Sequence, residues 1–290
     1  MLEKKIDEFA IKNNICIGIC DALPLSLKNV REVPFVKADL EMRISPKRFF
    51  EEAESIIIFA VPYETLEEVP NSSEPYGKFA MGTMGTDYHI RLKNLVTAFI
   101  EYFSSYCEFR YKIHIDTGDL IEREFAKKAG LGFIGKNAML INEQLGSCFN
   151  IAMLLVNVKL QPSQVKETIG CGDCNICEKA CLGGAIKNYN FDYKNCVSYL
   201  TQKKEDLSIE EIEKLHKFIY GCDICQRVCK FNIGKFSKQE FRIDVETFLN
   251  LSNKEFKIEY GKTAIAWRGK KILQRNARAC LKNNLDNFEL

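Results

Sequence analysis

Residues 171–181 read CGDCNICEKAC, and residues 222–229 read CDICQRVC. The four cysteines of the first run have the C-x2-C-x2-C-x3-C spacing of a cubane iron-sulfur site. Cysteines two residues apart can wrap a loop around three irons of one cube, whereas the fourth, three residues further on, points away. The second run adds three cysteines, and Cys196 stands alone between the runs, which makes eight thiols. That number is enough for two four-cysteine cubanes.

The spacing also predicts how the thiols are shared. In two-cluster ferredoxins the fourth cysteine of such a run ligates the other cluster. By that rule the first cluster is bound by Cys171, Cys174, Cys177 and Cys229. The second cluster is bound by Cys181, Cys196, Cys222 and Cys225. Crossed ligation places the two clusters close enough for electrons to pass between them.

Zinc is the alternative, since paired C-x2-C units also form tetrahedral zinc sites. A zinc site takes four ligands, which would leave a cysteine of each tight run unused, so the spacing favours iron-sulfur clusters. Leu182 and Lys230 follow the terminal cysteines, where bacterial ferredoxins usually have proline. Because proline shapes the turn and ligates nothing, this difference weakens the prediction only slightly.

Length and composition restrict the class of protein. At 290 residues and 46% hydrophobic, the chain can bury the core of two domains, or of one large domain with an insertion. Its 41 basic and 39 acidic residues nearly balance, so any nucleic-acid contact must come from a local patch. Thirteen cysteines, an odd number in tight clusters, favour metal binding in a reducing compartment over a disulfide scaffold. With no signal-like start and no apolar run of bilayer length, we expect a soluble, cytoplasmic protein without membrane contact.

Strand and helix patterns alternate before the cysteine runs. Apolar runs predict strands over residues 14–22, 55–63 and 111–116, and a hairpin formed by 138–142 and 147–158. Helices are expected after Ser45, with Pro46 at the first position, and after Thr86. The pattern predicts an α/β (α+β) fold: a mixed sheet layered with helices, then a two-cluster ferredoxin-like domain and a short helical C-terminal tail. The expected domain boundaries are 1–162, 163–240 and 241–290.

Two polar residues of this first part are candidates for chemistry. Asp116 follows a predicted strand, at the kind of position where ligands of α/β sheets bind, although it could instead cap the helix that begins near Asp119. His89 is either a plain first-turn helix residue or part of a pocket at that helix terminus. The segment around it, DYHIRL, has Leu92 where the D-x-H-x-x-G signature of histidine-ligated cobalamin proteins has glycine, so we reject that motif.

A glycine-rich string and a basic tail also need an interpretation. GLGFIG, at residues 130–135, follows a predicted helix, whereas a dinucleotide fingerprint follows a strand, so we do not expect nicotinamide binding.

The tail segment WRGKKILQRNARACLKN, from Trp267 to Asn283, alternates basic and apolar positions. Such a pattern usually indicates a helix face exposed to solvent. The functional alternative is a face that contacts the phosphates of structured RNA.

Several fragments together resemble the epoxyqueuosine reductase family. DTGDLIEREFAKKAGLGFIGKNAMLI, followed by Gly146 and Ser147, resembles that family's D-[ST]-x-P-x-x-E-R…AGLGW-x-GK-[NH]…GS block. GKFAMGTMGTDYH is similar to its YA-x-G-x-DYH, both cysteine runs match, and the tail is like its RRGK…LRNA segment. The chain departs from the pattern at Asp119 and Phe133, where the family has proline and tryptophan. It ends at Leu290, without the helical repeats that longer members use beside tRNA, so we expect tRNA affinity to rest on the basic tail and the cluster domain.

The resemblance implies a function. Members reduce epoxyqueuosine to queuosine in tRNA, with electrons passing through two 4Fe-4S clusters to cobalamin, which is bound base-off with no protein lower ligand. By motif position Asp116 is the proton donor, and burial beside the corrin would have to raise its pKa, since a free carboxylic acid is ionised at neutral pH. The expected cobalamin contacts are Arg43, Tyr88, His89, Asp116, Lys136, Asn137 and Ser147. The expected tRNA contacts are Arg268, Lys270, Lys271 and Arg275.

The expected partners are tRNA carrying epoxyqueuosine at the anticodon and an external electron donor of the ferredoxin or flavodoxin type, with the chain a monomer. One alternative is a corrinoid iron-sulfur reductive dehalogenase, although those proteins typically carry an export signal. Another is a non-enzymatic ferredoxin-type electron carrier or RNA-binding module. About 160 residues before the clusters are far more than a carrier needs.

Overall fold

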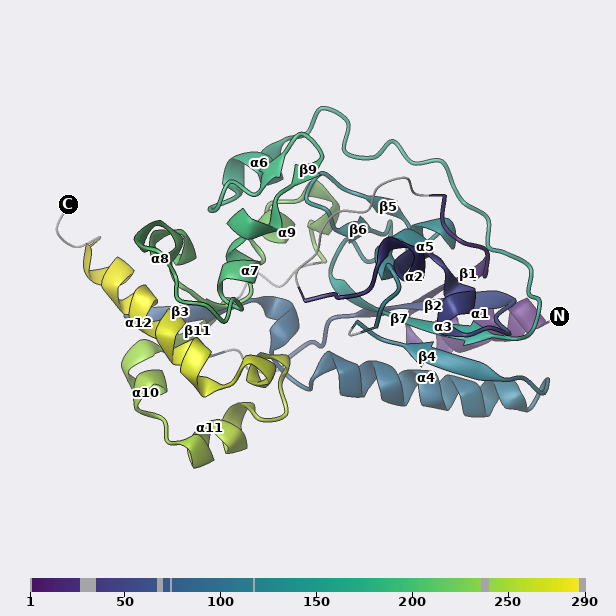
Figure 1. Ribbon diagram of the computed structural model, residues 1–290, viewed down its shortest axis with the longest axis horizontal. Coiled ribbons are helices and arrows are strands. Elements are labelled where there is room, and N and C mark those ends of the chain that lie inside the picture. Colours follow the sequence, from purple (N-terminus) through teal and green to yellow (C-terminus); the bar gives the residue numbers. More distant parts are fainter. Residues whose placement is uncertain are drawn as a thin grey trace. The chain divides into compact units, whose positions relative to one another are not determined.

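The computed structural model describes residues 2–26, 35–66, 70–73, 75–116, 118–235 and 240–286 (Figure 1). The chain forms two compact units. The first unit contains Met1–Pro62 and His89–Gly172, and the second contains Tyr63–Tyr88 and Asp173–Leu290. Residues 63–88, expected in the first domain, therefore belong with the second unit, as does the tail. The division by function into a cobalamin domain, a cluster domain and an RNA-binding tail stays a prediction.

A four-stranded sheet forms the centre of the first unit. Its strand order is β1 (Cys16–Asp21), β2 (Ser55–Pro62), β7 (Phe149–Val156) and β4 (Tyr111–His114), and all neighbours are antiparallel. Seven of the eight residues of β2 are buried, because helices cover both faces of this central strand. The strands predicted around residues 14–22, 55–63 and 111–116 are thus confirmed.

Helices on opposite faces of the sheet complete this core. On one face Phe99 of α4 (Tyr88–Ser104) packs edge-on, at 5.1 Å, against both Phe59 of β2 and Phe9 of α1 (Leu2–Asn13). On the other face Phe125 of α5 (Glu122–Lys128) joins a buried cluster with Ile58 and Met153. Figure 1 shows α4 running along the sheet. The side chains alternate between the faces as the pleat of a strand requires.

Three local expectations need correction. Leu140–Ile141 (β6) pairs with Phe133–Ile134 (β5). The predicted hairpin between residues 138–142 and 147–158 is therefore wrong in its pairing. The helix after Ser45, α3 (Pro46–Phe49), lasts one turn because Phe50 is already extended, and it follows the short α2 (Leu40–Ile44). α4 begins at Tyr88 and not directly after Thr86, whose N–H donates to Glu64 Oε2 at 2.8 Å.

The rejection of GLGFIG as a dinucleotide fingerprint agrees with the fold. This string connects the end of α5 to β5, so it does not lead from a strand into a helix. No helix among the described residues combines the length and the apolar character that a membrane crossing requires.

The second unit contains a three-stranded sheet with mixed pairing. Its central strand β3 (Tyr76–Phe79) pairs in parallel with β10 (Phe218–Tyr220) and antiparallel with β11 (Phe241–Asp244). Phe79 packs against Phe248 of α10 (Val245–Asn250) and Tyr260 of α11 (Asn253–Tyr260), with ring centroids 6.0 and 5.9 Å apart. The tail helix α12 (Lys270–Asp286) buries Leu273, Ala277 and Cys280 in the same core. The tail is therefore an integral part of the second unit.

The cysteine-rich segment of the second unit consists of short elements. These are α6 (Ile176–Ala180), β8 (Ile186–Lys187), β9 (Asn190–Phe191), α7 (Val197–Leu200), α8 (Ile209–Leu215) and α9 (Ile224–Arg227), with 3-10 turns at Tyr193–Asn195 and Lys230–Asn232. Two further 3-10 turns of the second unit, Met81–Thr83 and Ala264–Arg268, lie outside this segment. Helix α8 begins with the capping box formed by Ser208 and Glu211, in which each side chain accepts from the other residue's N–H, at 3.2 and 2.9 Å.

Candidate functional site

Four of the predicted cluster ligands come together inside the second unit. Burial raises the pKa of Cys222, and the nearby thiols Cys196 and Cys181 add to this effect. Burial likewise raises the pKa of Cys225, which interacts with Cys222, Cys196, Cys181 and Cys177. The set predicted for the second cluster thus forms one group, as crossed ligation requires. Among the described residues no three His, Cys, Asp or Glu side chains converge on a single metal ion.

Backbone N–H groups point at the sulfurs of this group. Ala185 N–H donates to Cys181 Sγ at 3.2 Å. The N–H groups of Ser198 and Tyr199 donate to Cys196, which directly precedes α7, and that of Ile224 donates to Cys222. N–H···S bonds stabilise thiolates and are one of the factors that set the reduction potential of a bound cluster. The donors and the half-buried thiols therefore fit a thiolate-bound cluster.

The remaining predicted ligands are divided between the units. Cys171 is buried in the first unit, and Cys174, Cys177 and Cys229 are half-buried in the second. Lys136 lies at the Cys171 turn: its backbone N–H is 3.5 Å from Cys171 Sγ, and its Nζ donates to Gly172 O at 2.8 Å. The ammonium group of Lys136 thus holds the loop of the first cysteine run.

Asp116 and His89 are brought together in the first unit. Asp116 Oδ2 lies 3.5 Å from His89 Nε2, and the two side chains are 53% and 35% exposed. Asp116 has a φ of +47°, and its N–H donates to Glu122 Oε1 at 2.6 Å. The residue at the N-cap of α5 is Ile121, without a side-chain cap bond, so the alternative of Asp116 as a helix cap is not realised.

The other expected cofactor contacts of the first unit are mostly buried. Ser147 and Asn137 are 1% and 4% exposed, and Asn137 Oδ1 accepts from Met139 N–H at 3.2 Å. The Nδ2 of Asn137 is buried without a hydrogen-bond partner among the described residues. Burial, with Arg123 nearby, lowers the pKa of Arg43 on α2. Buried polar groups normally have hydrogen-bond partners, so the Asn137 amide is suited to donate to a bound ligand. Tyr88 begins α4 and belongs with the second unit.

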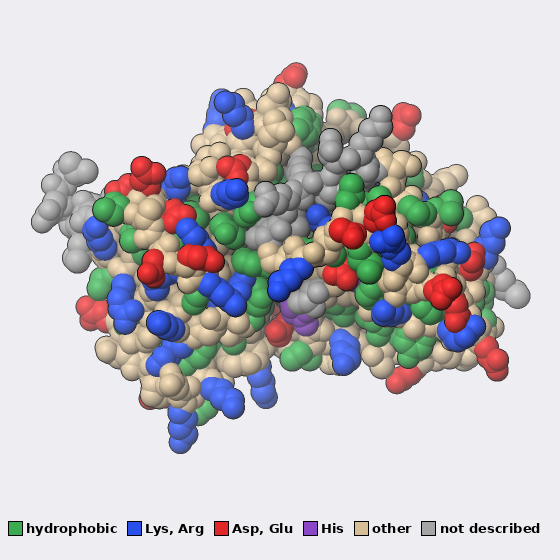
Figure 2. All heavy atoms as spheres, in the orientation of Figure 1, with side chains coloured by type: hydrophobic (Ala, Val, Ile, Leu, Met, Phe, Trp, Pro, Cys, Tyr) green, Lys and Arg blue, Asp and Glu red, His purple; other side chains and the backbone are tan. Residues whose placement is uncertain are grey.

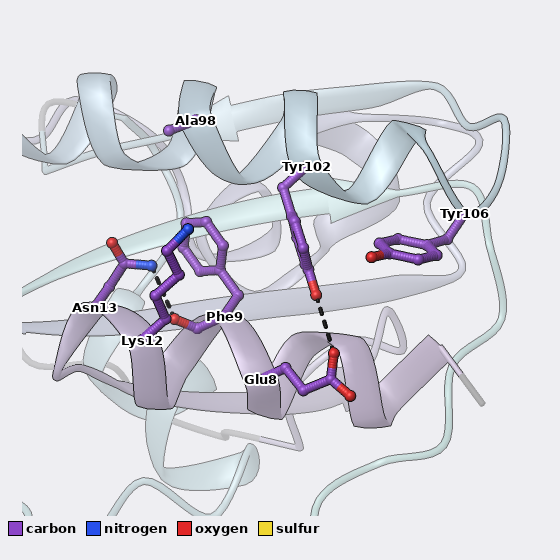
Figure 3. A pocket seen from close by; sticks show the side chains of 7 residues that line it. All are labelled: Glu8, Phe9, Lys12, Asn13, Ala98, Tyr102 and Tyr106. Atoms are coloured by element: carbon purple, nitrogen blue, oxygen red, sulfur yellow. Dashed lines mark hydrogen bonds between the residues drawn. The ribbon is translucent and has the colours of Figure 1, made fainter.

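A shallow pocket of the first unit lies away from these residues. It has a volume of about 460 Å³ between α1 and α4, and Tyr102 donates across it to Glu8 Oε2 at 3.4 Å (Figure 3). Its lining residues are Glu8, Phe9, Lys12, Asn13, Ala98, Tyr102 and Tyr106. None of them is an expected cofactor contact.

The basic residues of the tail differ in how they are used. Lys271 is exposed, Lys270 Nζ donates to Leu251 O at 2.8 Å, and the Arg268 guanidinium stacks 3.5 Å from the centre of the Trp267 ring. Lys and Arg side chains stand on the surface over α11 and α12 in Figure 2. This surface retains exposed cations and one exposed aromatic ring.

Arg275 is the exception, because its donors are used inside the second unit. Nη1 donates to Lys203 O and Glu205 O, Nη2 to Leu200 O and Asn276 Oδ1, and Nε to Asn276 Oδ1. Guanidinium has five N–H donors, so each has an acceptor. The expectation of a phosphate contact for Arg275 is corrected to a structural role.

Comparison with known proteins identifies the family. Residues 170–232, which include all eight expected ligands, match a 4Fe-4S double cluster binding domain. Residues 43–117 match the family described as epoxyqueuosine reductase QueG, DUF1730. The epoxyqueuosine reductase of Staphylococcus aureus is 37% identical over 258 residues, which cover 84% of this chain and 67% of that protein. The chain belongs to the epoxyqueuosine reductase family.

Solved epoxyqueuosine reductases contain the fold of this chain. The structure of the Streptococcus thermophilus epoxyqueuosine reductase superposes with a TM-score of 0.88 at 34% identity, over 97% of this chain and 81% of that one. An epoxyqueuosine reductase solved with an epoxyqueuosine-modified tRNA-Tyr stem loop also gives 0.88, at 30% identity, over 99% and 83%. This chain thus spans about two thirds of the curated relative and four fifths of the solved structures.

Membership of the epoxyqueuosine reductases decides between the alternatives. The chain is an oxidoreductase, so the reading as a plain electron carrier is set aside, and the double-cluster domain confirms iron-sulfur over zinc. The family match at residues 43–117 contains Arg43, Tyr88, His89 and Asp116.

The sequence patterns did not single out His114 and Glu122, which contact each other and the backbone of Asp116. One signal could have found them. His114 occupies an inward position of the strand YKIHID, and a buried histidine needs a polar partner, which the nearby glutamate can provide.

Proposed function

We propose that this chain reduces epoxyqueuosine to queuosine in tRNA, the last step of queuosine biosynthesis. Two 4Fe-4S clusters pass electrons to cobalamin, and Asp116 is the proton donor. The observation that carries the proposal is family membership over most of a chain whose eight clustered cysteines all fall within the double-cluster match. Because tRNA is the substrate, we place the enzyme in the cytoplasm.

The reaction determines what the protein must provide. Removing the oxygen of an epoxide to leave a double bond consumes two electrons and two protons and releases water. Cobalamin supplies a strong reductant and nucleophile when it is bound and reduced. The half-buried cysteines of the second unit, whose sulfurs receive backbone N–H donors, would hold a cluster. The remaining residues bind, orient and protonate.

The first unit is the proposed cobalamin-binding part, with the corrin base-off and no protein ligand below the cobalt. The buried Nδ2 of Asn137 supports this placement, because a corrin amide or phosphate oxygen would supply its missing acceptor. Arg43, Ser147, Tyr88 and His89 remain proposed contacts. For Lys136 the hydrogen bond to Gly172 O supports a role at the cluster loop in addition.

Asp116 is the proposed acid for the leaving oxygen. Its carboxyl is half exposed, so it can meet a substrate, and His89 at 3.5 Å can exchange protons with it. General acid catalysis requires the acid to be protonated at the start of the step. Asp116 therefore has to hold a proton when the substrate is bound.

The proposed tRNA surface is the exposed part of the basic tail. An epoxyqueuosine reductase has been solved with a modified tRNA stem loop, and this chain shares its fold. Arg268, Lys270 and Lys271 are the proposed phosphate contacts, and Trp267, 53% exposed, offers a ring for base stacking. Arg275 is withdrawn from this set. The proposed electron donor is an external ferredoxin or flavodoxin, and the chain is proposed to act as a monomer.

The decisive experiment is anaerobic reconstitution with iron, sulfide and cobalamin, followed by an assay on a tRNA stem loop carrying epoxyqueuosine. We expect conversion to queuosine that depends on both cobalamin and a low-potential reductant. Full conversion without cobalamin would contradict the proposed cofactor. Loss of the corrin absorbance on gel filtration, with iron retained, would contradict cobalamin binding itself.

A further inference from the structure

His114 ends strand β4 with a completely buried side chain. Its Nε2 accepts the N–H of Leu120 at 3.1 Å, and the Phe49 ring packs against the imidazole in a T-shaped arrangement with ring centroids 5.3 Å apart. A ring nitrogen that accepts a hydrogen bond carries no proton, so the neutral imidazole carries its proton on Nδ1. The fold thus fixes both the orientation and the tautomer of His114.

The protonated nitrogen of His114 faces Glu122. Nδ1 lies 3.3 Å from Glu122 Oε1, which is an ion-pair distance without the alignment of a hydrogen bond. The same Oε1 accepts the backbone N–H of Asp116 at 2.6 Å. Glu122 is the first residue of α5, and its side chain is 17% exposed. One carboxylate oxygen therefore connects the buried end of β4 to the backbone of Asp116.

This connection constrains the turn that carries Asp116. Asp116 adopts a φ of +47°, a conformation that is unfavourable for a non-glycine residue and needs support from its surroundings. Gly118 is required for a steric reason, because a Cβ there would lie 2.2 Å from His114 Nε2. The turn is held by the Asp116 N–H bond on one side and by close packing on His114 on the other.

We propose that Glu122 and His114 are positioning residues that hold Asp116 in the turn where its carboxyl faces His89. The inference rests on the proposed role of Asp116 as proton donor. Neither side chain touches the substrate in this proposal. Glu122 acts through the backbone of Asp116, and His114 acts through Glu122 and the Leu120 N–H.

The test compares substitutions on one helix. Glu122→Ala removes the acceptor of the Asp116 N–H, Glu122→Gln keeps an acceptor oxygen of the same reach, and Glu124→Ala is the control in the same helical turn. For the reconstituted enzyme we expect Glu122→Ala to lower kcat about 10²-fold with little change in the KM for the stem loop, the effect of a misplaced reacting group. Glu122→Gln should retain most of the activity, and Glu124→Ala all of it.

Amide hydrogen exchange gives a readout that does not depend on turnover. In the metal-free and in the reconstituted protein, the peptide that contains Asp116 should exchange faster in Glu122→Ala than in the wild type and in Glu124→Ala. Unchanged exchange in Glu122→Ala would overturn the proposed hydrogen bond.

A double-mutant cycle separates the positioning role from the proposed function. If Glu122 acts through Asp116, Glu122→Ala should cost little further activity in an Asp116→Asn background. Additive losses, or a wild-type kcat in Glu122→Ala alongside an impaired Asp116→Asn, would overturn the positioning role and leave the proposed function intact. A fully active Asp116→Asn would instead reject the acid itself, and this inference with it.

Discussion

His89 Nε2 lies 3.5 Å from Asp116 Oδ2, so the first turn of α4 and the turn after β4 place an imidazole beside a carboxyl group. The two residues come from different elements of the first unit and are both accessible. The pair thus places two titratable groups side by side at the surface of the first unit.

Asp116→Asn should leave cobalamin binding intact and reduce turnover by about 10²–10⁴-fold, because an amide cannot replace a general acid. The measurement is queuosine formation in single-turnover assays, with the corrin absorbance as the binding readout. Asp119→Asn, in the same turn, is the matched control and should keep wild-type turnover. Equal rates for Asp116→Asn and the wild type would show that the proton comes from elsewhere.

Cys196→Ser should abolish binding of the second cluster, because Cys196 interacts with Cys181, Cys222 and Cys225 in one half-buried group. We expect about half of the wild-type iron and sulfide after anaerobic reconstitution, and loss of turnover. Cys107→Ser is the control, since Cys107 lies outside the cysteine runs. Full iron content in Cys196→Ser would mean that another residue is the fourth ligand.

Arg275→Met should destabilise the second unit by about 2–3 kcal/mol, because it leaves the carbonyls of Leu200, Lys203 and Glu205 without a charged donor. Thermal unfolding of the reconstituted protein is the measurement. Arg278→Met, on an exposed position of the same helix, should leave the Tm nearly unchanged. If Arg278→Met lowers the Tm as much, the carbonyl contacts of Arg275 are not the cause.

Lys271→Ala should weaken stem-loop binding without affecting stability, since Lys271 is exposed. Loss of one phosphate contact should reduce the slope of log K against log salt by about one. Binding is measured by fluorescence anisotropy over a salt series. Lys4→Ala, on exposed α1, is the control. An unchanged slope in Lys271→Ala would exclude Lys271 from the interface.

Cys20 should resist alkylation in the folded protein. Burial raises its pKa to about 12, with Lys128 as a weaker opposing influence, and its side chain is 1% exposed. At about pH 8.5 the folded thiol is therefore protonated and inaccessible, whereas Cys107 is only half-buried. Mass spectrometry after iodoacetamide treatment should show Cys107 modified first. Comparable labelling of Cys20 would mean that β1 opens readily.

The same shift of the Cys20 pKa fixes the sign of its effect on stability. Below the unfolded pKa of 9.0 the thiol is protonated in both states and adds no pH dependence. As the pH rises above 9, the unfolded chain ionises while the folded chain does not, so the free energy of unfolding falls. Cys20→Ala should therefore show a smaller decrease in the free energy of unfolding above pH 9. Urea unfolding at several pH values would measure this difference.

The sequence by itself determined the double-cluster domain and the central strands. Cysteine spacing is a local property, because short loops between cysteines can wrap only a small metal centre, and the residues predicted as ligands all lie within the matched domain. The strands over Cys16–Asp21 and Ser55–Pro62 could likewise be predicted from the sequence, because β-branched apolar runs of that length are typical of buried strands.

Only the tertiary structure decided which polar residues act together. Arg275 looked like its neighbours in a basic segment, but three of its five donors bind backbone carbonyls that lie 70 to 75 residues away in the chain, and the other two bind the side chain of Asn276. The partner of Leu140–Ile141, and the contact of His114 and Glu122 with Asp116, also arise from how the elements pack. The physical reason is the same in each case: a local pattern records the preference of a residue for burial or solvent, whereas a hydrogen bond depends on which distant group the fold brings within about 3 Å.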